Sequence, residues 1–73
     1  MLNVTFTIAT DESTNYAATV ESGMHEQGIY HERLGLAVKF IVDWYMDLVS
    51  EFVQEADRLR VDFKDGTVMT ISA

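Results

Sequence analysis

The 73-residue chain contains no cysteine and no proline. Without cysteine, neither a disulfide nor a thiolate metal site can form. Basic residues are also scarce, because five Lys and Arg stand against twelve Asp and Glu and leave a formal charge of −7. This imbalance argues against direct binding to nucleic acid or to an anionic membrane, and it favours a basic partner.

Long apolar runs are absent too, because charged residues interrupt each apolar stretch. We therefore expect no membrane-spanning helix. Residues 1–5 lack the basic start and apolar run of a signal peptide, which predicts a cytoplasmic location. Hydrophobic residues make up 48% of the chain, too many for a disordered segment. The length and composition together predict a single globular domain over residues 1–73.

The first twenty residues have the period of two strands. Residues 2–9 alternate between apolar and polar side chains, and residues 16–21 alternate again. The polar residues 11–15 between them are typical of a turn. Pairing Ile8 with Tyr16 keeps the apolar side chains on one face, so we predict a hairpin.

From about residue 30 to residue 57 the apolar period changes to 3.6, which predicts one long amphipathic helix. The stretch 23–31 before it is predicted to be a loop, or a short helical turn between Gly23 and Gly28. The stripe expected to face the sheet consists of Leu34, Ala37, Val38, Ile41, Tyr45, Leu48, Val49, Phe52 and Ala56.

A second hairpin is predicted at the end of the chain, where Leu59, Val61 and Phe63 alternate with charged residues. A three-residue loop 64–66, with Gly66 in the left-handed conformation, pairs Phe63 with Thr67 and keeps the apolar face intact. A two-residue Asp-Gly turn would not. The predicted fold is a two-layer α+β domain of order ββαββ, with a four-stranded antiparallel sheet packed on one long helix.

A row of acidic residues is the most informative feature of the predicted helix. Asp43, Asp47, Glu51 and Glu55 recur at a spacing of four, so they would form a carboxylate ridge along one side. Like charges at that spacing destabilise a helix, which suggests a ridge that docks on a basic groove. The alternative is an ordinary solvated face. Carboxylates strung along a straight helix diverge, which argues against a Ca²⁺ or Mg²⁺ site.

The same predicted helix carries more apolar residues than one sheet can cover. Phe40, Trp44 and Met46 are therefore candidate anchors for a partner. Alternatively, the loop 23–31 and the strand ends cover them. A third interpretation is self-association through Val42, Met46, Val49 and Val53, which would make the protein a homo-oligomer.

No motif for catalysis or cofactor binding is present. His25 and His31 are six residues apart without an HExxH motif, although a metal or small-molecule site using them and nearby carboxylates is an open alternative. The serines have no recognisable base partner, and there is no glycine-rich phosphate loop. We therefore expect no enzyme, no cofactor and no metal.

The size, acidity, lack of cysteine and compact α+β layout resemble the small inhibitors encoded by phages and mobile elements. The anti-CRISPR and DNA-mimic anti-restriction proteins are the class that these features resemble, although no residue motif carries the resemblance. It implies a non-enzymatic inhibitor in the host cytoplasm, of a class whose members are often dimers or bound stoichiometrically to their target. Its partner would be a larger protein or ribonucleoprotein complex with a basic surface, whose phosphate sites the carboxylates would occupy.

Overall fold

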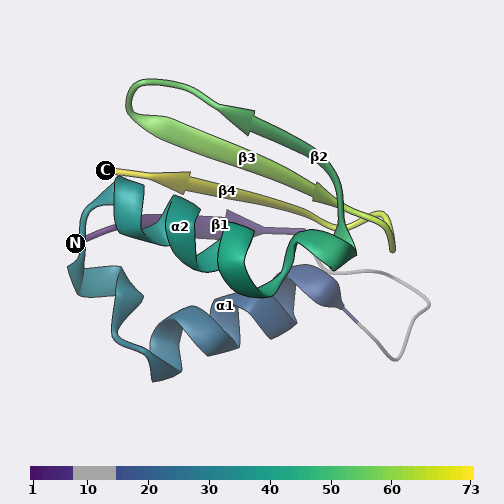
Figure 1. Cartoon of the computed structure of the whole chain (residues 1–73), viewed down its shortest axis with the longest axis horizontal. Coiled ribbons are helices and arrows are strands. Elements are labelled where there is room, and N and C mark those ends of the chain that lie inside the picture. The colour runs from purple at the N-terminus through teal and green to yellow at the C-terminus, as the bar shows by residue number, and fades with distance from the viewer. Residues whose placement is uncertain (8–14) are drawn as a thin grey trace.

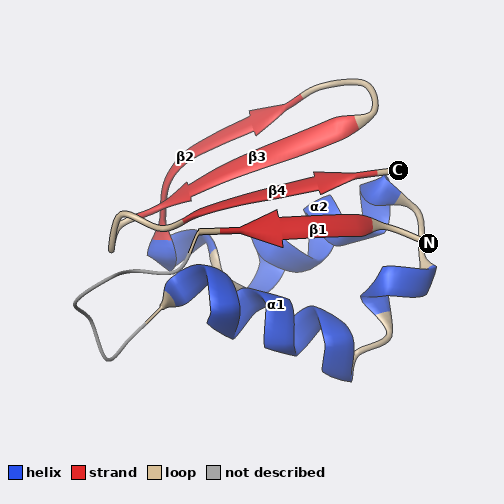
Figure 2. Cartoon of the chain, turned by 180° about the vertical axis from the view of Figure 1, so that it is seen from behind, coloured by secondary structure: helices blue, strands red, loops and turns tan. Residues whose placement is uncertain are grey.

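The computed structural model describes residues 1–7 and 15–73, which form two layers: a four-stranded antiparallel sheet and two helices on one of its faces (Figures 1 and 2). The strand order is β1-β4-β3-β2. The strands are β1 (Asn3–Phe6), β2 (Val49–Gln54), β3 (Arg58–Phe63) and β4 (Val68–Ser72). Between β1 and β2 lie the helices α1 (Tyr16–Glu26) and α2 (Leu34–Trp44), and the short 3₁₀ turns η1 (Ile29–His31) and η2 (Met46–Leu48).

The α+β class and the four-stranded antiparallel sheet are confirmed, and the hairpin of β3 and β4 has the predicted register. Val61 pairs with Met69, and the Phe63 N–H donates to the Thr67 carbonyl at 2.8 Å. Gly66 has a φ of 90°. A side chain at that φ would be strained, so the glycine is what allows this three-residue loop.

The predicted hairpin of strands 2–9 and 16–21 is wrong in its second half, because residues 16–26 form helix α1. Asn15 caps this helix by accepting a hydrogen bond from the Ala18 N–H at 3.0 Å. Ala17, Val20 and Met24 then face the sheet and are buried. The proposed pairing of Ile8 and the turn at 11–14 lie outside the described residues.

The predicted single helix over residues 30–57 is also wrong. Helix α2 ends at Trp44, and the chain then passes through η2 into strand β2, which forms one edge of the sheet. A bulge at Ser50 shifts the pairing, so that Val49 lies opposite Phe63 while Glu51 lies opposite Asp62. The element order is therefore one strand, two helices and three strands rather than ββαββ.

The core lies between the sheet and the two helices. Helix α1 packs along β1, helix α2 packs on β3, and the two helices touch each other. The largest fully buried side chains come from both layers and are Val20, Met24, Ile41, Leu59, Val61, Met69 and Ile71, with Thr67 as the one buried polar side chain among the described residues. Strands β1 and β2 are the two edge strands of the sheet. Helix α1 packs beside β1.

Candidate functional site

The predicted carboxylate ridge does not exist as a helical row, because its four residues lie on four different segments. Asp43 is on α2, Asp47 on η2, Glu51 on β2, and Glu55 follows β2. Two of them are held by basic neighbours: the Asp43 carboxylate is 2.7 Å from the Lys39 ammonium, and the Glu55 carboxylate is 2.8 Å from the Arg58 guanidinium. A continuous line of carboxylates along one helix therefore has no basis in this fold.

The candidate apolar anchors are divided between two segments. Leu36, Phe40 and Trp44 follow one another at intervals of four residues on α2, so they share one side of the helix. We call the two aromatic residues of this set, Phe40 and Trp44, the aromatic row. Trp44 is 72% exposed, whereas Phe40 is half-buried. Met46 belongs to η2 and is also exposed. The aromatic row is thus the part of the candidate site that the fold does bring together.

The flank predicted for self-association is not one surface. Val49 is buried in the core, paired with Phe63. Val53 lies opposite Arg60, on the face of the sheet turned away from the helices. Only Val42 and Met46 of that set remain exposed near α2.

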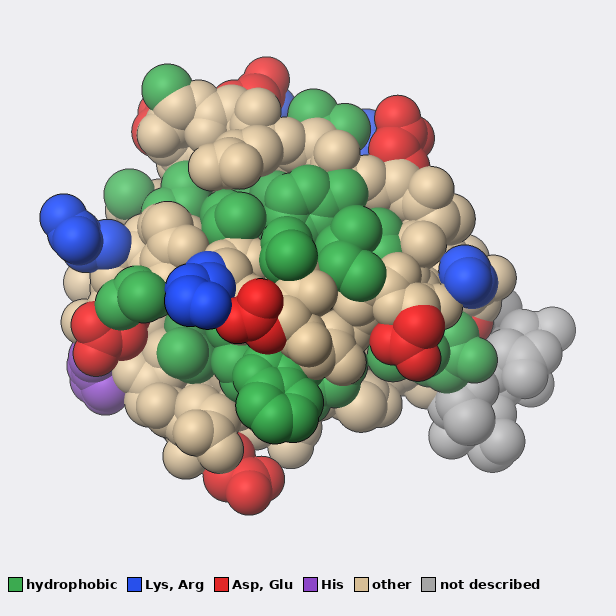
Figure 3. Space-filling view, in the orientation of Figure 1, with side chains coloured by type: hydrophobic (Ala, Val, Ile, Leu, Met, Phe, Trp, Pro, Cys, Tyr) green, Lys and Arg blue, Asp and Glu red, His purple; other side chains and the backbone are tan. Residues whose placement is uncertain are grey.

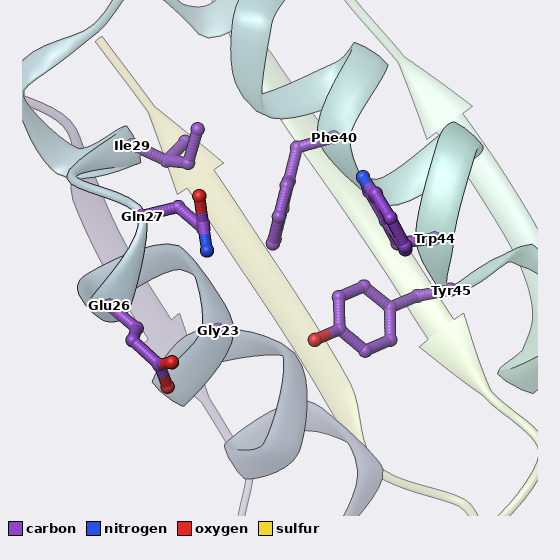
Figure 4. A pocket seen from close by; sticks show the side chains of 7 residues that line it. All are labelled: Gly23, Glu26, Gln27, Ile29, Phe40, Trp44 and Tyr45. Carbon is purple, nitrogen blue, oxygen red and sulfur yellow. The ribbon is translucent and has the colours of Figure 1, made fainter.

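A pocket of about 300 Å³ lies between the two helices (Figure 4). Helix α2 and the residue after it contribute three aromatic side chains, those of Phe40, Trp44 and Tyr45. The opposite wall comes from the C-terminal part of α1 and the turn that follows, with Gly23, Glu26, Gln27 and Ile29. One wall is therefore aromatic, and the other carries a carboxylate and an amide.

A close approach of the two helices positions the aromatic wall. A Cβ atom at Gly23 would lie 2.5 Å from the Tyr45 hydroxyl oxygen and 3.3 Å from the Phe40 ring, so only glycine leaves room for these rings. The Phe40 and Tyr45 rings meet edge to face with their centres 5.5 Å apart. The absence of a side chain at Gly23 therefore lets both rings pack against α1.

A second, shallower hollow continues along α1 from this pocket. It shares Gly23, Glu26 and Tyr45 with the first pocket and extends past Tyr16 to Leu48. The two hollows form a groove between α1 and the C-terminal end of α2. We call this the α1–α2 groove.

The α1–α2 groove contains Gly23, Glu26 and Gln27, which were not predicted as site residues, and Tyr45, which was predicted to face the sheet. The signal that would have found them is the cap at Asn15 followed by apolar residues at 17, 20 and 24, which is helical spacing. Recognising that helix places Glu26 at its end, on the same side of the domain as α2.

The other side of α2 carries Val38 and Val42. Val38 and Val42 are each two residues from Phe40, about 200° round the helix axis, so they lie opposite the aromatic row. Val42 is 47% exposed, and Phe52 on β2 is half-buried on the helix-bearing face of the sheet. Figure 3 shows apolar side chains gathered on this face of the molecule, with both acidic and basic side chains around the edge of that region.

The two histidines are exposed and lie on different elements, His25 on α1 and His31 at the end of η1. His25 packs edge to face on the Tyr30 ring, with ring centres 5.6 Å apart. The Tyr30 hydroxyl donates a hydrogen bond to the Glu21 carboxylate. Burial, this hydrogen bond and the charge of Glu21 raise the pKa of the Tyr30 hydroxyl well above its ordinary value. Within residues 1–7 and 15–73, no group of three His, Asp or Glu side chains is placed to hold a metal ion.

Comparisons with protein-family models, with curated proteins and with solved structures give no match to this chain. Within the part of the chain that the structure describes, no helix combines the length and apolar character needed to cross a membrane.

Proposed function

We propose that this protein is a non-enzymatic protein-binding module that recognises a basic segment of a larger partner through the α1–α2 groove. The observation that carries the proposal is the position of Trp44. Its side chain is 72% exposed and stands at the edge of a pocket, next to the half-buried Phe40. Exposed tryptophan beside a pocket is the kind of anchor that dominates binding energy in protein interfaces.

The charge distribution supports a basic partner. Three of the five Lys and Arg residues, Lys39, Arg58 and Arg60, are already paired with carboxylates of the same chain. None of the residues lining the pocket is basic, and Glu26 opens onto it. An aromatic pocket with one carboxylate, Glu26, on its wall and a net charge of −7 on the chain favour a partner that presents an apolar surface with basic groups beside it.

Affinity capture followed by titration with the purified partner tests this proposal. The tagged protein would be used as bait at low and moderate salt, and a captured protein would be purified and titrated by calorimetry. We expect Trp44→Ala to weaken binding roughly 30-fold, as for an interface hot spot. Thr5→Ala, an exposed position on the opposite face of the sheet, should bind like wild type.

Two outcomes would contradict the proposal. One is that no purified protein binds the wild-type chain. The other is that the Trp44→Ala variant binds with wild-type affinity, which would remove the α1–α2 groove from the interface. Binding that weakens as salt is raised is the expected signature of a basic partner.

The edge strand β2 supports a second candidate function, self-association. Its outer edge carries unpaired backbone groups, and Val42 and Phe52 leave apolar surface beside it. A second copy pairing along β2 would continue the sheet and cover both side chains. Light scattering after size exclusion over a range of concentrations tests this, and a molecular mass that stays at one chain would exclude it.

The inhibitor role implied by the compositional resemblance remains a proposal about the identity of the partner. Its target would be a nucleic-acid-handling complex with a basic surface. The acidic charge would then act by long-range attraction. A helical ridge that imitates a row of phosphates is not part of this mechanism, because the four carboxylates do not share a helix.

A further inference from the structure

We infer that the pocket between α1 and α2 is a binding site for the guanidinium group of an arginine side chain. This inference rests on the proposed function, since the arginine would belong to the partner segment. It names the group that enters the pocket lined by Phe40, Trp44 and Tyr45 and closed on the other side by Glu26 and Gln27.

The aromatic wall fits a flat cation. Phe40 and Trp44 are one turn apart on α2 and both project toward the pocket, and Tyr45 lies next to them (Figure 4). Guanidinium groups stack on aromatic faces and are attracted by the electron-rich ring, with tryptophan the strongest of the three. The aliphatic stem of an arginine side chain can at the same time cover Ile29, which lines the same pocket.

The opposite wall is negative. Glu26 is the last residue of α1, and the C-terminal end of a helix carries a partial negative charge that favours cations. Among the described residues, Glu26 forms no ion pair within the chain. Its carboxylate can accept two parallel hydrogen bonds from a guanidinium group, and the Gln27 side chain, whose amide can also accept, lines the same wall.

The dimensions favour one side chain over a larger ligand. At about 300 Å³ the pocket is at the lower limit of the range for drug-sized ligands. The second hollow of the α1–α2 groove begins where this pocket ends, because both border Gly23, Glu26 and Tyr45. A peptide chain lying along the groove would therefore insert one side chain here and continue toward Leu48.

Titration with capped tripeptides tests the inference directly. The probes are acetyl-Gly-Arg-Gly-amide and the same peptide with citrulline, which keeps the shape of arginine but is neutral. A lysine peptide provides a cation that lacks the planar guanidinium group. Binding is followed in ¹H–¹⁵N spectra through the Trp44 indole N–H and the backbone N–H groups of residues 23–29. The chain has one tryptophan, so the indole signal needs no assignment experiment.

The arginine peptide should shift these signals, the lysine peptide should bind more weakly, and the citrulline peptide should give no saturable shift. Glu26→Gln should weaken arginine binding roughly five-fold, as expected for an exposed ion pair. Glu32→Gln, an exposed carboxylate outside the pocket, is the matched control and should have no effect.

Equal binding of the arginine and citrulline peptides would overturn the inference, since no cation would then be recognised. Arginine-dependent shifts confined to residues outside the pocket, or no shift at all, would overturn it as well. Such results would leave the proposed function untouched, because a partner could still bind through the exposed face of Trp44. If the arginine peptide binds as expected but the partner titration fails, the proposed function is contradicted while the arginine site stands.

Discussion

The Asp65 carboxylate accepts a hydrogen bond from the backbone N–H of Tyr16 at 2.7 Å, although the two residues are 49 positions apart in the sequence. Asp65 lies in the turn between β3 and β4, and Tyr16 is the first residue of α1. The same carboxylate accepts hydrogen bonds from the N–H and the hydroxyl of Thr67, at 3.0 and 2.6 Å. The Thr67 hydroxyl oxygen in turn accepts one from the Ala17 N–H at 3.2 Å. The turn thus caps the helix that forms one wall of the pocket.

Replacing the capping carboxylate should therefore destabilise the whole domain. We expect Asp65→Ala to lower the free energy of unfolding by about 1–2 kcal/mol, as for the loss of a helix N-cap. Asp57→Ala, in the exposed turn between β2 and β3, is the control and should change it by less than about 0.5 kcal/mol. Urea unfolding of both variants measures the difference, and equal stabilities would show that the long-range cap contributes nothing.

Asp65 should also give the domain a specific sensitivity to acid. Burial alone would raise the pKa of its carboxyl, but hydrogen bonds from the Thr67 hydroxyl and from backbone N–H groups outweigh burial and lower the pKa below its ordinary 3.8. The stabilisation by the ionised group is therefore complete above the unfolded-state pKa, and it is lost as the pH falls through the folded-state pKa. Between about pH 5 and pH 2, wild type should lose stability more steeply than Asp65→Asn. Parallel stability curves would contradict this assignment.

The two helices should tolerate glycine replacement very differently. Gly23→Ala places a Cβ 2.5 Å from the Tyr45 hydroxyl oxygen, so we expect a loss of about 1–3 kcal/mol and a disturbed aromatic wall. The Tyr45→Phe background removes the clashing oxygen and should restore most of that loss. Gly35→Ala, where nothing lies within 4 Å, should instead stabilise the domain by up to about 1 kcal/mol. Thermal unfolding of Gly23→Ala, Tyr45→Phe, the double variant and Gly35→Ala measures these changes in stability. If Gly23→Ala is as stable as wild type, the helices do not need this close approach.

One acidic residue of the predicted ridge should prove unfavourable for stability. Glu51 lies directly opposite Asp62 on the neighbouring strand, and like charges in that position repel each other. Glu51→Lys should raise the free energy of unfolding by about 0.2–1 kcal/mol. Glu55→Lys should change it in the opposite direction, since it removes the ion pair with Arg58. A destabilised Glu51→Lys variant would mean that the pairing of β2 and β3 differs from the one described.

The hairpin of β3 and β4 and the helical segment α2 could be predicted from the spacing of their apolar residues. In the hairpin of β3 and β4, the apolar side chains share a face only with the three-residue loop, and the structure has that register. The segment from Leu34 to Trp44 is helical both in the prediction and in the structure, so Phe40 and Trp44 keep their shared side.

Strand β2 was mistaken for helix because of its bulge. An undisturbed strand turns every second residue inward, but the extra residue Ser50 makes Val49 and Phe52 both face the core, three positions apart. Three positions is also a helical spacing, and no glycine or proline marks the end of α2 at Trp44. The carboxylate ridge depended on that continuous helix and was lost with it.

Helix α1 was predicted to be a strand because its first residues alternate between apolar and polar side chains. The alternation of Tyr16, Ala18 and Val20 has the period of a strand, and it outweighed the local helix signal, which is the Asn15 cap and the apolar spacing of Ala17, Val20 and Met24. Two further hydrogen bonds to the start of the helix come from Asp65 and Thr67. Those contacts are made through the fold and have no local signal. Because α1 ends with Glu26 and is followed directly by Gln27, the pocket could not be predicted without this helix.

The most direct test of the account is a ¹H–¹⁵N spectrum of the protein recorded with and without the purified partner obtained by affinity capture. Partner binding through the α1–α2 groove predicts that the largest changes fall on Gly23, Gln27, Phe40 and the Trp44 indole, with the outer face of the sheet unchanged. Changes confined to β2, or to the face of the sheet that carries Arg58 and Arg60, would contradict it and place the interface elsewhere.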